Sequence, residues 1–491
     1  MPEGFRQARW REPLLSEISR PGRIGMMPPA DPEIEKEFPE PALLVPASIR
    51  RSSVELPELS ELQVLRHFNR LSQMNFSVEL GMYPLGSCTM KYNPKVSEMI
   101  ASADAIKQAH PLQPSETVQG ILSIMHDLER ILCEITGMGR FSLSTAAGAQ
   151  GEFAGVLMIR KYLHEHGGEE RDEILVPDSA HGTNPASAAM AGFKVVKVPS
   201  DSRGLVQAKT VSALVSEKTA GMMFTVPNTL GLFEGEVADV TKAVHDAGGL
   251  MYYDGANMNA LLGRARPGDM GFDVVHLNLH KTFATPHGGG GPGAGPVGAT
   301  EKLAGYLPVP VVSEDGGRFS LDYGLTHSIG PLKGFVGNSA ILLRAYTYIR
   351  LLGASGLSDV SSLAVLAANY LWKSLDQSGF ITSHGEGLTR KHESVVSVKG
   401  DPGGALKVAK ALLDNGMHSP TVYFPLIVSE ALMIEPTESE PVEMLDEYAN
   451  SMNRTYSSLR QGTLGEVPRN TSVGKVDEVK ASHPLTLKVH W

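Results

Sequence analysis

Cysteine is almost absent from this chain. Only Cys88 and Cys133 occur among its 491 residues. Two thiols exclude a disulfide framework, and they exclude a four-thiolate metal site built from this chain alone. This cysteine usage is typical of a reducing compartment, so we expect a cytoplasmic protein.

The sequence also lacks long apolar runs and an excess of basic residues. No run of about eighteen apolar residues occurs, so the sequence predicts no segment that spans a membrane. The formal net charge is -10, which leaves no basic stripe for a phosphate backbone. Both absences argue against a membrane protein and against a nucleic-acid partner.

The residues that are present have the composition of a globular protein, with 42% hydrophobic and 20% charged residues. Residues 1 to about 60 are rich in proline and glutamate without a sustained period, which predicts an extended arm. Helical patterning starts near residue 61. The stretch GMYPLGSCTMKYNP at residues 81–94 interrupts it with a predicted loop.

Short apolar runs then alternate with helical patterns. The runs EILVP, FKVVKVP, TAGMMFTVP and GLMYYDG all end in turn residues. Strands separated by helices predict an α/β fold with a mostly parallel sheet covered on both faces. Ligands of such sheets bind at the carboxyl ends of the strands. We predict an N-terminal arm and helical segment (residues 1–114), a large ligand-binding domain (115–345) and a smaller α+β domain (346–491).

A candidate phosphate-binding site lies in FSLSTAAGAQGEF. An apolar strand end runs into small residues and then into a helical pattern, so the N–H groups of Gly148, Ala149 and Gln150 are expected at a helix N-terminus. Oriented amides and the helix dipole favour an anion there. A helix entry that uses small residues only for packing remains the alternative, because a glycine turn alone is a weak motif.

The second glycine-rich segment does not read as a dinucleotide site. Residues 293–298 match GxGxxG, but Pro296 falls where a helix would have to open. We expect the glycines at 288–291 to let the backbone turn sharply beside a bulky flat ligand.

His276 and His280 are four residues apart, a spacing that can bind zinc on a helix. The segment HLNLH alternates as a strand does, and no third ligand stands at a suitable distance, so we predict no metal site. The same strand reading puts Asn278 and His280 on one face, with Lys281 at the end of the strand.

Lys281 enters a segment that is nearly bare of side chains. A lysine that forms a Schiff base must reach an aldehyde among small neighbours. Asp254 ends the apolar run YYDG, and a carboxylate is the partner that a pyridinium nitrogen requires. His181 follows EILVPDSA and could lie flat on a ring. Two alternatives stay open: that Asp254 only caps its turn, and that His181 only forms a hydrogen bond within its loop.

Along the chain, a phosphate site is followed by a histidine, an aspartate and a lysine. This order resembles that of enzymes with the fold-type I pyridoxal-phosphate-dependent transferase fold. The motifs HLNLHKTF, PHGGGGPG, SAHGTNPASA, GAQGE and LGSCTMKYNP are similar to those of the P-protein of the glycine cleavage system, glycine dehydrogenase (decarboxylating). The similarity runs from about residue 12 onward. The length is similar to subunit 2 of the split form, which corresponds to the C-terminal half of the single-chain form. One departure is Ala284, where many relatives carry cysteine.

The resemblance implies roles for particular residues. Lys281 matches the lysine that forms the Schiff base, Asp254 the partner of the ring nitrogen, and His181 the residue stacked on the ring. The remaining cofactor-binding candidates are Gly148, Ala149, Gln150, His280, Thr229 and Asn257.

The resemblance also implies an activity and partners. The implied reaction is pyridoxal-5'-phosphate-dependent decarboxylation of glycine in glycine catabolism, with transfer of the aminomethyl group to the lipoyl arm of the carrier H-protein. The enzyme is then an oxidoreductase that acts on a CH–NH2 group with a disulfide acceptor. A subunit 1 partner and a heterotetramer with two copies of each subunit are implied as well.

Other readings stay open at this stage. The same fold supports decarboxylation without a carrier, or sulfur transfer. A structural subunit without catalysis is a third reading, because one half of the two-half family lacks the lysine, but the presence of both Lys281 and Asp254 argues against it. The loop at residues 81–94 either binds the substrate carboxylate through Ser87, Thr89 and Lys91 or only supports a subunit contact.

Overall fold

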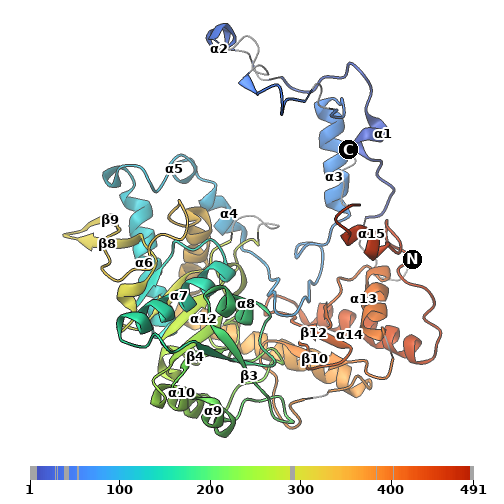
Figure 1. The fold of residues 1–491 in the computed structure, drawn as a ribbon. Helices are drawn as coiled ribbons and strands as arrows, with labels where there is room; N and C mark the ends of the chain where they lie inside the picture. Colours follow the sequence, from blue (N-terminus) through green and yellow to red (C-terminus); the bar gives the residue numbers. More distant parts are fainter. Residues whose placement is uncertain are drawn as a thin grey trace. The chain divides into compact units, whose positions relative to one another are not determined.

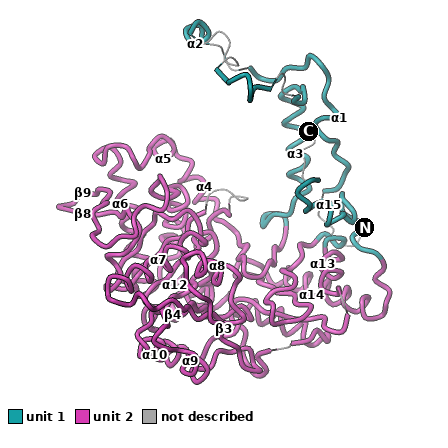
Figure 2. Tube along the Cα trace, viewed as in Figure 1, with its two compact units in different colours: residues 1–80, 413–416, 466–491 teal, residues 81–412, 417–465 magenta. Residues whose placement is uncertain are grey.

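The computed structural model describes residues 8–27, 29, 31–37, 44–51, 55–287, 293–382, 384–401 and 403–486 (Figure 1). The chain divides into two compact units (Figure 2). One comprises residues 1–80, 413–416 and 466–491, and the other comprises residues 81–412 and 417–465. The glycines at 288–291 lie outside the described residues, so the turn predicted there stays a prediction.

The first unit contains the arm and short helices. Its helices are α1 (Leu15–Ile18), α2 (Pro32–Glu37), α3 (Glu61–Gln73) and α15 (Glu478–Ser482). Helix α3 begins where helical patterning was expected, because Ser60 and Gln63 form a reciprocal capping box. His67 of α3 lies 3.1 Å from the Glu12 carboxylate, which ties the arm to this helix.

The second unit is built on a seven-stranded sheet with the order β1-β7-β6-β5-β4-β2-β3. Strands β2 to β6 pair in parallel, and β7 is antiparallel to both β1 and β6. The predicted α/β class with a mostly parallel sheet is therefore confirmed. The strands are β1 (Arg140–Ser142), β2 (Glu173–Pro177), β3 (Lys194–Val198), β4 (Thr219–Phe224), β5 (Leu250–Gly255), β6 (Val274–Leu277) and β7 (Val297–Ala299).

Both faces of the central strands of this sheet are buried, whereas the edge strand β3 is mostly exposed. Successive residues of β5, Tyr252 and Tyr253, point to opposite faces and enter two different apolar clusters, as do Met222 and Met223 of β4. Two covered faces explain why these strands read as continuous apolar runs. The helices of this part are α4 (Lys95–Ala101), α5 (Asp104–Lys107), α6 (Gln119–Thr136), α7 (Gly148–Glu165), α8 (Thr183–Met190), α9 (Ala208–Leu214), α10 (Val237–Asp246) and α11 (Leu279–Thr282).

The segment before Lys281 differs from its prediction. Strand β6 ends at Leu277, and Leu279–Thr282 form the single-turn helix α11. The alternation in HLNLH continues past the strand end, so it did not mark one extended segment. Asn278 and His280 therefore do not share a strand face. Residues 293–298 open no helix, and β7 begins at Val297, which agrees with rejecting the dinucleotide motif.

Helix α12 (Ser339–Gln377) links the sheet to the C-terminal part of this unit. The helix has 39 residues, and Gly353 has non-helical backbone angles that kink it. Among the described residues it alone is long and apolar enough to cross a membrane by length and composition, a test that core helices of soluble proteins also pass. Its Ile341 and Leu342 pack in the core of the sheet domain, and its Leu371 and Leu375 pack in the C-terminal core.

The C-terminal part has α+β architecture, as expected. Strand β12 (Ala431–Ile434) lies between β10 (Ser394–Ser397) and β11 (Thr421–Val422), all antiparallel. The apolar segment TVYFPLIVSEALMIEP is not one strand, because it forms β11, a turn and β12. Helices α13 (Gly404–Asp414) and α14 (Val442–Arg460) belong to this region, and β8 (Val311–Asp315) and β9 (Arg318–Asp322) form a separate hairpin.

Candidate functional site

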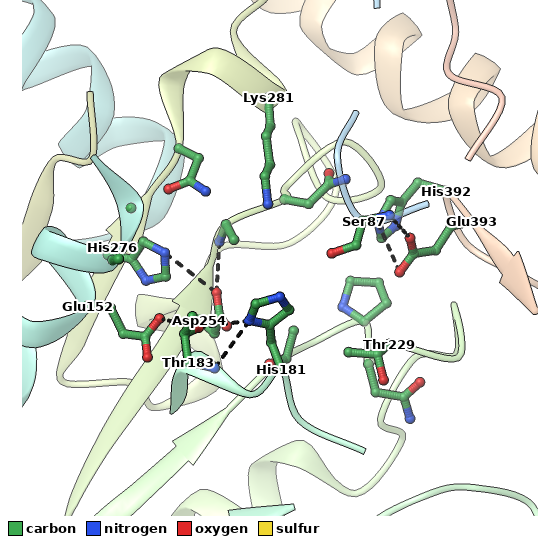
Figure 3. A pocket seen from close by; sticks show the side chains of 18 residues that line it. Ser87, Glu152, His181, Thr183, Thr229, Asp254, His276, Lys281, His392 and Glu393 are labelled. Carbon is green, nitrogen blue, oxygen red and sulfur yellow. Dashed lines mark hydrogen bonds and ion pairs between the residues drawn. The ribbon is translucent and has the colours of Figure 1, made fainter. Parts of the chain in front are cut away.

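A cavity of about 140 Å³ lies where strands β2, β4, β5 and β6 end (Figure 3). This is the edge at which parallel sheets bind ligands. An engineered cavity of about 150 Å³ holds one benzene ring, so this space suits a single aromatic ring. The lining residues are Ser87, Gly148, Ala149, Glu152, His181, Thr183, Thr225, Pro227, Asn228, Thr229, Asp254, Ala256, Asn257, His276, Asn278, Lys281, His392 and Glu393.

Lys281 lies on α11, directly after β6. The strand carries the chain to the cavity, and Asn278 is the N-terminal cap residue from which the short helix starts. In Figure 3 the side chain of Lys281 extends into the cavity above Asp254 and His181. The amine of Lys281 therefore points to the part of the cavity where an aromatic ligand would lie.

Asp254 stands at the end of β5 and is buried. Its Oδ2 accepts a hydrogen bond from the Asn184 amide at 3.0 Å, and its Oδ1 accepts one from the Ala256 N–H, also at 3.0 Å. Burial opposes the charged form, but His276 at 3.6 Å and the two donors outweigh it and lower the pKa of Asp254. The carboxylate therefore caps its turn, as the alternative reading expected, and also presents negative charge to the cavity.

A second carboxyl group, Glu152 on α7, lies beside Asp254. Burial and the neighbouring Asp254 charge raise the pKa of Glu152 to about 7. Burial lowers the pKa of His276 to about 4, although Asp254 acts in the opposite direction. At neutral pH the histidine is uncharged, so Asp254 is the principal charge on this wall.

His181 precedes α8 and lies close to Asp254 (Figure 3). Its Nδ1 is 2.8 Å from the Thr183 hydroxyl, so the bond within the loop that we weighed is present. Burial lowers the pKa of His181, against the effect of Asp254 and with that of Lys281. Its ring is therefore neutral at neutral pH. Thr229, on the loop after β4, lines the same cavity and donates to the Ser179 carbonyl.

The N-terminus of α7 forms another wall. Ala147 is its cap residue and makes no side-chain capping bond, and Gly148 and Ala149 line the cavity. A Cβ on Gly148 would overlap the Asn278 amide, so only glycine fits at this first position. The uncapped amides of an 18-residue helix that face a cavity provide an anion-binding site.

Two predicted residues do not line the cavity. Gln150 turns away, since its Oε1 accepts from the Ala146 N–H at 2.7 Å and its Nε2 donates to the Leu332 carbonyl at 3.3 Å. His280 packs against the ring of His287, with 5.0 Å between the ring centroids. Burial lowers the pKa of His280 to about 3.

The loop at residues 81–94 reaches the cavity only in part. Ser87 lines it, and the Ser87 N–H donates to Glu393 at 2.8 Å. Thr89 is buried and donates to Glu435 through both its N–H and its hydroxyl. The Lys91 amine is buried outside the cavity lining, where it donates to the Thr282 carbonyl and pairs with Glu438 at 2.8 Å. Lys91 therefore does not offer a donor to a substrate carboxylate.

An acidic wall from the C-terminal part faces the cavity. Burial and the neighbouring Glu435 raise the pKa of Glu393 well above its ordinary value, and burial raises that of Glu435 to about 7. Asn257, one of the predicted residues, lines the cavity and donates to Glu435 at 2.7 Å. Burial, aided by the Lys281 charge, lowers the pKa of His392 to about 3. Burial therefore favours the protonated forms of Glu393 and Glu435, the acids opposite the Asp254 wall.

These acids also form the group of potential metal ligands found within the described residues. Ligand atoms of His392, Glu393 and Glu435 lie within 4.8 Å of one another. Burial raises the pKa of both carboxyl groups, whereas a carboxyl group must be deprotonated to bind a metal ion. The chemistry of this group therefore gives no reason to place a metal here.

Sequence reasoning missed Glu152, Asn278 and Glu393. Glu152 sits one turn into the helix that begins at the predicted phosphate site, so GAQGE did carry a signal. The sequence predicted that Asn278 shares a strand face with His280, but Asn278 lies after the end of β6 and caps α11. Glu393 and His392 stand just before β10, far along the chain, and nothing in HESVVSV pointed to the cavity.

The residues fit pyridoxal phosphate. An anion site, a ring-sized space, a buried carboxylate and a lysine converge on one cavity, and the Asn278 Oδ1 and Thr225 Oγ1 atoms that line it are buried without hydrogen-bond partners among the described residues. Buried polar atoms normally have partners, so a polar ligand is expected to supply them.

Comparisons with known proteins agree with this fit. A family model described as "Glycine cleavage system P-protein" matches residues 40–316, and one described as "Glycine dehydrogenase, C-terminal domain" matches residues 360–477. A protein of Pyrococcus furiosus named probable glycine dehydrogenase (decarboxylating) subunit 2 is 54% identical over 487 residues, which cover 97% of this chain and 96% of that protein. A protein of Thermoplasma volcanium with the same name is 49% identical over 484 residues, which cover 99% of each.

Solved structures share the fold. The crystal structure of a glycine decarboxylase (P-protein) of the glycine cleavage system in inhibitor-bound form has a TM-score of 0.73 at 22% identity, covering 88% of this chain and 99% of that one. A glutamate decarboxylase of Lactobacillus brevis has a TM-score of 0.65 at 15% identity, covering 86% of this chain and 98% of that one. The expected fold-type I architecture is confirmed.

Proposed function

Since the chain belongs to the glycine cleavage system P-protein family, with relatives named as subunit 2 of glycine dehydrogenase (decarboxylating), we propose that Lys281, Asp254 and His181 carry out its chemistry. The activity is pyridoxal-phosphate-dependent decarboxylation of glycine. The observation that carries the residue assignment is the convergence of Lys281 and Asp254 on a ring-sized cavity beside the uncapped N-terminus of α7.

Pyridoxal phosphate bound in this cavity supplies an electron sink that accepts the electrons left when carbon dioxide departs. Lys281 would bond covalently to the cofactor, and the amides of Gly148 and Ala149 would bind its phosphate. The negative charge of Asp254 would favour a protonated ring nitrogen, and His181 would pack against the ring.

The remaining lining residues orient glycine and exclude water. Ser87 offers a hydroxyl, and Asn257 belongs to the same wall as Glu435. Glu393 lines the cavity, and burial and the neighbouring Glu435 raise the pKa of its carboxyl group well above the ordinary value, which favours its protonated form. Thr229 stays fixed to the Ser179 carbonyl and closes the side of the loop after β4.

The subunit 2 name of the relatives implies a subunit 1 partner. We infer further that the two subunits form a heterotetramer with two copies of each, and that the aminomethyl group passes to the lipoyl arm of a carrier H-protein in the cytoplasm. Light scattering of the co-expressed subunits measures the stoichiometry. Glycine-dependent exchange of labelled bicarbonate, with and without lipoylated H-protein, tests the carrier.

Cofactor attachment tests the site directly. The co-purified complex is expected to absorb visible light with pyridoxal phosphate, and borohydride reduction is expected to fix the cofactor mass on the peptide that contains Lys281. The Lys281→Ala variant is expected to lose both signals while keeping its thermal unfolding temperature. A label on another lysine would overturn the assignment of Lys281.

A further inference from the structure

The register of two neighbouring strands brings Tyr252, Asp254 and His276 together. Tyr252 and Asp254 are two residues apart on β5, so their side chains leave the same face of the sheet. His276 is the partner of Asp254 on the parallel strand β6, which sets its side chain beside them. All three side chains are buried. The phenol, the imidazole and the carboxylate therefore form one enclosed group.

The two ring nitrogens of His276 face different members of this group. Its Nδ1 lies 2.5 Å from the hydroxyl oxygen of Tyr252. Its Nε2 lies 3.6 Å from Oδ1 of Asp254, which is too long for a full hydrogen bond but close enough for an N–H group to attract a carboxylate (Figure 3). Helix α7 packs directly on the group, since a Cβ on Gly155 would lie 2.5 Å from Cε2 of Tyr252.

The partners of the two nitrogens determine where the proton of His276 lies. Among the described residues, the Tyr252 hydroxyl has a hydrogen-bond contact with Nδ1 alone. If Nδ1 donated to the phenol oxygen, the phenol proton would be buried without an acceptor, which is costly. Tyr252 therefore donates, and Nδ1 keeps its lone pair. The proton of the neutral ring is then on Nε2, where it faces the carboxylate of Asp254.

The other two forms of the ring do not satisfy both contacts. A proton on Nδ1 alone would set the lone pair of Nε2 against the carboxylate of Asp254. A doubly protonated ring would attract Asp254, but it would offer no lone pair to Tyr252 and would cancel the charge of the carboxylate. Burial also favours the neutral ring and lowers the pKa of His276 to about 4, although Asp254 opposes this effect.

We propose that Tyr252 is a positioning residue that acts through His276 on Asp254: its hydrogen bond to Nδ1 keeps the imidazole neutral, with the Nε2 proton toward the carboxylate. Asp254 then keeps its full negative charge for a ligand in the cavity. Tyr252 is not among the residues that line the cavity, so it does not touch that ligand itself. The proposal rests on the proposed function, in which the charge of Asp254 acts on the ring nitrogen of the cofactor.

The test compares wild type, Tyr252→Phe and Tyr253→Phe in the two-subunit complex. Tyr253 is a matched control, because it is equally buried on the opposite face of β5 and its hydroxyl donates to the Val226 carbonyl at 2.5 Å. Dissociation constants are measured for pyridoxal phosphate and for its deaza analogue, in which a C–H group replaces the ring nitrogen. Thermal unfolding of the cofactor-free complexes measures the cost of each substitution to the fold.

Tyr252→Phe is expected to weaken binding of pyridoxal phosphate roughly threefold to tenfold, the effect of one hydrogen bond, and to leave binding of the deaza analogue unchanged. The two ligands differ because only the ring nitrogen responds to the charge of Asp254. Tyr253→Phe is expected to change both constants by the same factor. Equal weakening of both ligands in Tyr252→Phe, or no weakening of either, would overturn the proposal, because Tyr252 would then only fill the core.

The proton of His276 can also be located without the cofactor. Solid-state 15N spectra of the histidine-labelled, cofactor-free complex, with His276→Asn as the difference control, report which ring nitrogen is protonated. We expect a proton on Nε2 alone at neutral pH, and a proton on Nδ1 would overturn the proposal. If Asp254→Asn weakened both ligands by the same factor, the proposed function of Asp254 would be wrong, while the spectra would still decide whether Tyr252 sets the form of His276.

Discussion

The buried amine of Lys91 donates a hydrogen bond of 2.7 Å to the backbone carbonyl of Thr282, the residue that follows Lys281. The loop at residues 81–94 therefore holds the turn that carries Lys281. Lys91 is also paired with Glu438 and bonded to Asn259, which connects α11 to the C-terminal part of the unit. Its role is structural support of the site rather than contact with substrate.

Lys91→Met is expected to lower the free energy of unfolding by about 3 to 5 kcal/mol, because it leaves Glu438 buried without its cation. Denaturant unfolding measures the loss. Lys107→Met is the matched control, since Lys107 forms an exposed pair with Asp104 and should cost at most about 1 kcal/mol. Equal losses in the two variants would contradict the assigned role of Lys91.

Asp254→Asn is expected to reduce the rate of glycine decarboxylation roughly 10-fold to 150-fold, the range that corresponds to losing one charged hydrogen bond. The amide keeps the size and the turn but supplies no negative charge to a ring nitrogen. Bicarbonate exchange measures the rate. Asp254→Glu keeps the negative charge on a longer side chain, so it tests whether the charge alone restores part of the rate. A rate for Asp254→Asn equal to wild type would remove Asp254 from catalysis.

Gly148→Ala is expected to weaken binding of pyridoxal phosphate, because its methyl group would overlap the Asn278 amide and displace the first turn of α7. Overpacking of this kind costs about 1 to 3 kcal/mol. Gly120→Ala on α6 is the control, since a Cβ there meets nothing within 4 Å and alanine favours a helix. Titration of the apo complex with cofactor measures both variants, and unchanged affinity in Gly148→Ala would argue against the phosphate site.

The pH dependence of stability should carry the signature of Glu435. Burial raises its folded pKa to about 7 from an ordinary value of 4.5, so between these values the folded state binds the extra proton. The free energy of unfolding must therefore fall as pH rises through this window. Glu435→Gln removes the titrating carboxyl group, so the free energy of unfolding should fall less steeply with pH in this variant. Denaturant unfolding at several pH values measures the difference. An unchanged slope would show that Glu435 ionises normally.

The sequence predicted candidate site residues correctly where they lie next to the end of a strand. Asp254 ends one apolar run and His181 lies shortly after another, so the rule for parallel sheets places both at one edge of the sheet. The periodicity of HLNLH misled, because a strand and the helical turn after it can share an alternating pattern. Local patterns report only the element in which they occur.

Contacts between distant segments had no local signal. Glu393 reaches the cavity because β10 pairs with β12 and brings the C-terminal part against the loop that carries Ser87. Lys91 looked like a substrate donor, but four partners from four distant segments satisfy it. Such long-range packing depends on the whole fold and cannot be read from one stretch.

The cavity wall is assembled from both ends of the chain around the sheet. Ser87 precedes the sheet in sequence, and His392 and Glu393 follow it after the long helix α12. A nascent chain that has been synthesised only as far as residue 345 contains Lys281 and Asp254 but lacks His392 and Glu393, which line the cavity. The ability to hold the cofactor would thus arise late in synthesis, when the last antiparallel strands have been translated and paired.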